Sequence, residues 1–113
     1  MVAFLKEFNS NGETQGMATT PQMELHSWGE QMVWANEDDY HACWKLVRKG
    51  MSLPIEAGNV THFVLVGNGL LRDGDGSVRE IGSSGIIPPD FFGEVVATSN
   101  SLILVEVGSG RIA

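Results

Sequence analysis

The alternation of apolar and polar residues along the chain predicts short β-strands separated by turns. Residues 40–47 alternate with a period of two, which places successive side chains on opposite faces of a strand. The two faces are Tyr40, Ala42, Trp44 and Leu46 on one side, and His41, Cys43, Lys45 and Val47 on the other. Residues 60–66 are nearly all β-branched or aromatic, which also favours a strand.

Turn residues separate further strands, which are expected over 31–34, 94–97 and 102–107. The Asp-Gly pairs at 73–76 predict a hairpin between residues 70–72 and 77–81, because glycine adopts a positive φ without steric cost. Calcium binding by this loop is disfavoured, because its flanks are strands rather than the helices of an EF-hand. Pro88 and Pro89 exclude a central strand from residues 86–93. With no helical pattern, the chain is predicted to be all-β, a sandwich or barrel.

The length of 113 residues fits one domain. Residues 1–20 are interpreted as an N-terminal arm and linker, because an apolar stretch over 2–8 gives way to polar residues over 9–16. Residues 21–113 are expected to form the single β-domain. Phe4, Leu5 and Phe8 are expected to pack on this domain or on a partner subunit.

The charge balance excludes several classes of partner. A net charge of −7 argues against nucleic acid, which requires clustered cations. The dense basic group Lys45, Arg48 and Lys49 is interpreted as a solvated strand end. No apolar run approaches the roughly 20 residues that a membrane-spanning helix needs, and no signal peptide is apparent at residues 1–8. The single Cys43 excludes an intramolecular disulfide and is interpreted as a buried, inert thiol, so a cytoplasmic location is expected.

Two sets of spaced glycine, proline and ligand-type residues resemble the paired motifs of the cupin superfamily. The first set is Gly50, Glu56, Gly58, His62 and Gly69, and the second is Gly82, Pro88, Asp90, Gly93 and Ala97. The resemblance extends from about Tyr40 to Val107. It implies a double-stranded β-helix, also called a jelly-roll, closed into a small cupin barrel.

The resemblance is in the turn residues more than in the ligands. Family metal sites use imidazoles and a carboxylate, but Gly58 and Gly93 stand at two of the ligand positions. Glu56 and His62 remain, with His41 as the next available ligand, so no cofactor is expected and a divalent metal is the alternative. His62 and Glu56 also have purely structural interpretations. His62 can be a hydrogen-bonded histidine inside the barrel, and Glu56 can be a solvated carboxylate in a turn.

We therefore expect a small-molecule-binding or regulatory barrel without the usual metal site. The expected pocket residues are His41, Trp44, Glu56, His62 and Phe92. The alternative is a cupin enzyme of the oxygenase or isomerase class, metal-dependent or acid–base, that uses His62, Glu56 and His41. Binding of a cyclic nucleotide is disfavoured, because no arginine or helix follows the Gly93-Glu94 pair. The resemblance also implies a homodimer, because cupin-like barrels often dimerise through their N-terminal strands. The apolar residues Val2, Phe4, Leu5 and Phe8 and the two apolar faces of residues 60–66 suit such a buried interface.

Overall fold

A computed structural model describes residues 22–112, which form ten β-strands and no helix. The strands are β1 (Gln22–His26), β2 (Gly29–Asn36), β3 (Tyr40–Arg48), β4 (Ser52–Ile55), β5 (Val60–Val66), β6 (Gly69–Asp73), β7 (Val78–Ile81), β8 (Ile86–Ile87), β9 (Gly93–Ala97) and β10 (Ser101–Ser109). Within this described part, no segment qualifies as a helix that could span a membrane.

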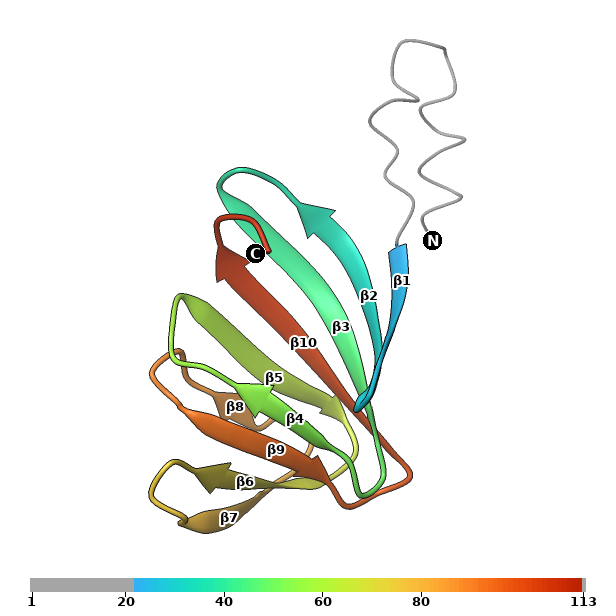
Figure 1. Cartoon of the computed structure of the whole chain (residues 1–113), viewed down its shortest axis with the longest axis vertical. Helices are drawn as coiled ribbons and strands as arrows, with labels where there is room; N and C mark the ends of the chain where they lie inside the picture. Colours follow the sequence, from blue (N-terminus) through green and yellow to red (C-terminus); the bar gives the residue numbers. More distant parts are fainter. Residues whose placement is uncertain (1–21, 113) are drawn as a thin grey trace, which may run out of the picture.

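The strands form two antiparallel sheets that face each other. The larger sheet has the order β1-β2-β3-β10-β5-β8, and the smaller has the order β4-β9-β6-β7. Because β10 lies between β3 and β5, the last strand of the chain joins the first half of the sequence to the second. In Figure 1 the smaller sheet lies beside one end of the larger one, and β2, β3 and β10 continue beyond it.

The apolar core lies between the two sheets. It consists of Trp28, Val47, Leu53, Ile55, Val64, Leu71, Ile87, Val95, Ala97, Leu102 and Leu104. Apart from Trp28, which lies in the turn between β1 and β2, these residues come from strands of both sheets, and within a strand they occupy every second position, as the period of a strand requires. Burial of this face fixes the register, since a slip by one residue would turn every inward side chain outward.

The predicted all-β class is confirmed, and so are the strands and the hairpin expected from the pattern. The pattern did not predict β4, which contains Pro54. This strand lies at the edge of the smaller sheet, where a residue without an N–H is tolerated. The two residues of β8 directly precede Pro88 and also form a sheet edge, which agrees with the exclusion of a central strand. The expected N-terminal arm, residues 1–20, lies outside the described residues.

Candidate functional site: a buried carboxylate among three cationic or imidazole side chains

Four polar side chains meet on the inner face of the larger sheet: His41, Lys45, His62 and Glu106, here called the interior quartet. The strand register brings them together from three neighbouring strands. Glu106 on β10 lies opposite Cys43 of β3 on one side and opposite His62 of β5 on the other. His41 and Lys45 lie two positions either side of Cys43, so their side chains share its inward face.

The Glu106 carboxylate is the centre of the quartet. Its Oε2 lies 2.8 Å from Nε2 of His41, and its Oε1 lies 3.0 Å from Nε2 of His62. The Lys45 ammonium forms an ion pair with the same Oε1. The side chains of Glu106 and both histidines are more than nine-tenths buried, and that of Lys45 is largely buried. A buried carboxylate needs such partners, because removal of an unpaired charge from water is costly.

The Glu106 carboxyl remains ionised at neutral pH. Burial on its own raises the pKa of this group, but the hydrogen bond from His62 and the positive charge of Lys45 outweigh burial. The net effect holds the pKa of Glu106 well below its ordinary value of 4.5. Glu106 is therefore a hydrogen-bond acceptor toward every other member of the quartet.

His41 is held by acceptors at both ring nitrogens. Nδ1 lies 2.8 Å from the carbonyl oxygen of Gly110, and Nε2 lies 2.8 Å from Oε2 of Glu106. A carbonyl and an ionised carboxylate can only accept, so both hydrogen bonds form together only when both nitrogens carry a proton. The ring of His41 is therefore oriented by partners at both of its nitrogens.

The ring of His41 needs the glycine that lies opposite it on β10. Gly108 pairs with His41 in the strand register. An ideal Cβ on Gly108 would lie 2.5 Å from Cε1 and 2.8 Å from Nε2 of the imidazole. Contacts this short are not tolerated, so the missing side chain of Gly108 provides the space for the ring.

His62 has one ring nitrogen without a partner. Its Nε2 donates to Glu106, which leaves a lone pair on Nδ1 in the neutral ring. Nδ1 is buried and has no hydrogen-bond partner, and within residues 22–112 it is the one buried side-chain nitrogen or oxygen in this condition. Unsatisfied buried polar atoms are rare in native proteins and require an explanation.

Cys43 adjoins the quartet but is not a nucleophile. The side chain is buried, as the sequence analysis expects. Burial, followed by the negative charge of Glu106, raises the pKa of the Cys43 thiol to about 12. The thiolate, which is the reactive form, is therefore absent near neutral pH.

The expected metal ligands do not fit a divalent ion. Glu56 is exposed in the loop between β4 and β5 and forms no hydrogen bond or ion pair with His41 or His62. Both Nε2 atoms bind the Glu106 carboxylate, and the ammonium of Lys45 stands at that carboxylate where a metal would otherwise approach. Throughout residues 22–112, no group of three or more histidine, cysteine, aspartate or glutamate residues is arranged to hold a metal.

The other two expected pocket residues lie away from the quartet. Trp44 projects from the opposite face of β3, where its ring packs 5.3 Å from that of Trp34. The alternation of β3 requires this, since Trp44 is one residue from both Cys43 and Lys45. Phe92 is 61% exposed in the segment before β9 and lies near Gly74. The structure thus brings together His41 and His62 of the five expected residues, and places Glu56, Trp44 and Phe92 elsewhere.

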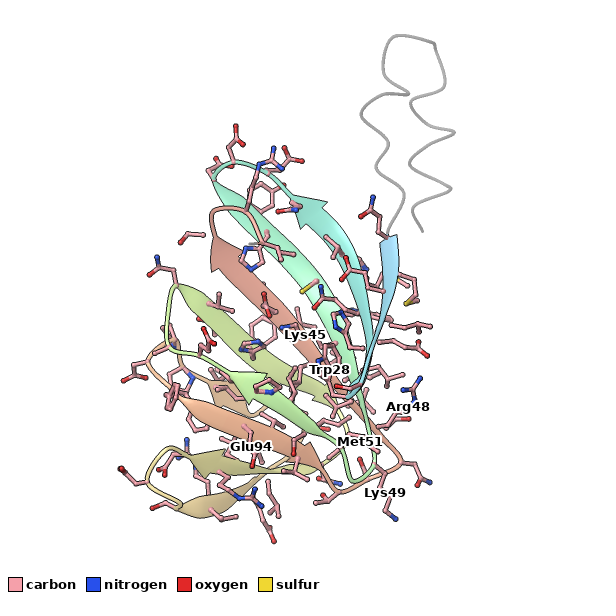
Figure 2. The ribbon with its side chains drawn as sticks, viewed as in Figure 1. Trp28, Lys45, Arg48, Lys49, Met51 and Glu94 are labelled. Atoms are coloured by element: carbon pink, nitrogen blue, oxygen red, sulfur yellow. The ribbon has the colours of Figure 1, made fainter. Side chains whose placement is uncertain are left out.

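The interpretation of Lys45 as part of a solvated strand end is wrong. Its side chain points inward to Glu106, whereas Arg48 and Lys49 are exposed. Figure 2 shows Lys45 within the body of the molecule, while Arg48 and Lys49 lie at its periphery where β3 ends. Sequence reasoning also omitted Glu106, although an acidic residue in the apolar run 102–107 was a usable signal.

Solved structures with a similar fold were found. An uncharacterised conserved protein with a double-stranded β-helix domain from Klebsiella pneumoniae subsp. pneumoniae matches with a TM-score of 0.61 and 18% identity, over 91% of this chain and 82% of that one. An RmlC-like cupin family protein from Methanocaldococcus jannaschii matches with a TM-score of 0.61 and 12% identity, over 82% of this chain and 91% of that one. The chain has the double-stranded β-helix fold of the RmlC-like cupins.

The cupin fold expected from the glycine and proline spacing is thereby confirmed. A third similar structure is the capsular polysaccharide assembling protein CapF from Staphylococcus aureus, with a TM-score of 0.59 and 12% identity over 83% of this chain. The chain spans 29% of the length of CapF. No protein-family model matches the sequence, and no curated protein matches it either.

Proposed function

We propose that this cupin-fold chain is a small-molecule-binding barrel and that the interior quartet recognises a hydroxyl group of the ligand. The observation that carries the proposal is the buried Nδ1 of His62, which has no partner. As an acceptor in the neutral ring, this atom takes a proton donor from a ligand.

The chemistry of the neighbouring cation supports a hydroxyl in particular. Lys45 has three N–H donors and contacts the same Glu106 oxygen as His62 does. A hydroxyl of a ligand can donate to Nδ1 of His62, and a second hydroxyl of the same ligand can accept from a further N–H of Lys45. Lys45 is also the most exposed member of the quartet, which makes it the first point of contact for a molecule that enters from solvent. Small polyols, sugars and hydroxy acids therefore form the proposed ligand class.

A different hollow on the surface offers a less specific site. A groove of about 590 Å³ lies beside β6 and β7, and it is lined by Asn68, Gly69, Leu70, Glu80, Ile81, Gly82 and Thr98. Its volume suits a small molecule. However, its lining includes none of the quartet, and Glu80 is its charged residue. We therefore assign recognition to the quartet, because a buried atom without a partner is the stronger mark of a ligand.

The proposal is tested by thermal unfolding and titration calorimetry with a panel of monosaccharides, sugar acids and small hydroxy acids. The description of CapF as capsular polysaccharide assembling is a reason to include sugars. A ligand present at 100 times its Kd should stabilise the wild type by about 2.7 kcal/mol. His62→Gln should abolish this effect, and His26→Gln, which changes an exposed histidine, should retain it. An equal effect in His62→Gln would refute the assignment, and so would the absence of any binding across the panel.

A regulatory role and a cytoplasmic location belong to the same proposal. The single thiol, Cys43, accords with a reducing compartment. The ligand-binding experiment tests neither the regulatory role nor the location.

A further inference from the structure

The chain turns back toward the quartet directly after β10. Ser109, the last residue of β10, donates its backbone N–H to the carbonyl oxygen of Asn59 at 3.1 Å. The next residue, Gly110, has a φ of 77°, a left-handed conformation that glycine adopts without steric cost. An ideal Cβ on Gly110 would meet nothing within 4 Å, so the backbone conformation and not a lack of space favours glycine there. In Figure 1 the chain curls back from the end of β10 toward β3.

Three hydrogen bonds attach residues 110–112, here called the strap, to the turn between β2 and β3. Nε of Arg111 donates to Oδ1 of Asp38 at 2.8 Å, and Nη1 of Arg111 donates to the carbonyl oxygen of Asn36 at 3.0 Å. The backbone N–H of Ile112 donates to Oδ1 of Asn36 at 2.9 Å. Because β3 lies between β2 and β10 in the sheet, the strap passes the end at which β3 begins.

The strap supplies one of the two hydrogen-bond partners of His41. The carbonyl oxygen of Gly110 accepts from Nδ1 at 2.8 Å, and Glu106 binds the other ring nitrogen. The His41 side chain is only 4% exposed, whereas the side chain of Asp38, which anchors the strap, is 92% exposed. Exposed ion pairs contribute about 0–1 kcal/mol, so the strap should open at a lower free energy than the strands that it follows.

We propose that the strap is a gate on the quartet, which in its closed position holds Nδ1 of His41 and on release makes that nitrogen accessible. The closed form leaves Nδ1 of His62 as the buried nitrogen without a partner among residues 22–112, and the open form adds Nδ1 of His41. Release breaks only hydrogen bonds, and it leaves the pairing of β10 with β3 and β5 intact because the strap follows β10. Access to His41 is measured without a ligand, so the gate and the proposed ligand can fail separately.

The experiment measures the rate at which diethyl pyrocarbonate modifies each histidine of the full chain, by peptide mass spectrometry. The three histidines of the chain provide internal comparisons. The His26 side chain is 36% exposed and should react rapidly in every variant, whereas His62 is buried and makes no hydrogen bond to the strap. Arg111→Gln combined with Asn36→Ala should raise the rate at His41 about tenfold and leave the rate at His62 within about twofold, because it removes the three anchoring hydrogen bonds.

Two variants serve as matched controls. Arg48→Gln makes the same change at an arginine that is 51% exposed and ion-paired with Glu30, at the other end of β3, and it should leave the rate at His41 unchanged. Asn36→Asp keeps an oxygen that accepts from the N–H of Ile112, so this variant should retain the slow rate of the wild type.

Two results would overturn the proposal. An unchanged rate at His41 in the double variant would show that the strap does not limit access to the ring. Equal increases at His41 and His62 would show a general loosening of the barrel and not the release of a gate. Circular dichroism checks that each variant is folded. If the double variant does not fold, Gly110→Ala provides the same comparison, because its Cβ strains the φ of 77° and contacts nothing else.

Discussion

Replacement of Glu106 by glutamine removes the charge on which the interior quartet depends. In the wild type, three side chains bind this carboxylate, and each hydrogen bond to a charged group contributes about 1.5–3 kcal/mol before desolvation is subtracted. Glutamine leaves the ammonium of Lys45 without a counter-charge in a mostly buried site. Loss of one partner from a buried ion pair costs about 3–5 kcal/mol, and we expect Glu106→Gln to lie in this range.

Urea denaturation gives the free energy of unfolding for this comparison. Glu94→Gln is the matched control, because Glu94 is also ion-paired, with Arg72, but at the surface, where a pair contributes about 0–1 kcal/mol. Lys45→Met should cost less in the Glu106→Gln background than in the wild type, with a coupling of about 0.5–3 kcal/mol. The reasoning fails if Glu106→Gln costs no more than Glu94→Gln, or if the Lys45 and Glu106 effects simply add.

The pH dependence gives an independent check on the same carboxylate. Since folding lowers the pKa of Glu106 below 4.5, the folded state binds this proton less tightly than the unfolded state. The stabilisation by Glu106 is therefore fully present above the unfolded pKa of 4.5, and it is lost as the pH falls through the lower folded value. The stability difference between wild type and Glu106→Gln should accordingly decrease as the pH falls below 4.5. A difference that grows on acidification would contradict the lowered pKa.

Two further predictions concern neighbours of the carboxylate. Gly108→Ala should displace the ring of His41 and destabilise the fold by about 1–3 kcal/mol by overpacking. Gly58→Ala, where nothing lies within 4 Å of the added Cβ, should change stability by less than about 0.5 kcal/mol in the same denaturation assay. Because folding raises the pKa of Cys43 from 9.0 to about 12, the folded chain should resist a thiol reagent at pH 8, and its stability should decline between pH 9 and pH 12. Rapid labelling of Cys43 in the native chain at pH 8 would show that the thiol is accessible and ionised.

The fold was predictable because its signals are local. The alternation over residues 40–47, the Asp-Gly turn at 73–76 and the spacing of the glycines each reflect a backbone requirement that sequence displays directly. The edge position of β4 was not predictable, because Pro54 is compatible with a strand only when its neighbour on one side is solvent. That condition depends on the order of strands in the sheet, which is a long-range property.

The candidate site was predictable only in part. The faces of β3 were assigned correctly, which placed His41, Cys43 and Lys45 together. Glu106 reaches the site because β10 pairs with both β3 and β5. The order of the strands in a sheet cannot be predicted from the alternation of apolar and polar residues, so the sequence did not identify Glu106. The spacing of the first cupin-like motif suggested Glu56 as a site residue. Glu56 lies in the loop between β4 and β5, so the motif identified a turn and not a ligand.

The interior quartet is complete within one copy of the chain. Every contact described for it joins residues of the same chain, so no residue of a second copy is needed to build the site. The ligand should therefore bind with a Kd that does not depend on the concentration of the chain, as calorimetry at two chain concentrations would measure. If association between copies changed the ligand affinity, the ligand would have to change the association by the same factor. A Kd that varies with chain concentration would mean that association alters the register of β3 and β10, which aligns Glu106 with its partners.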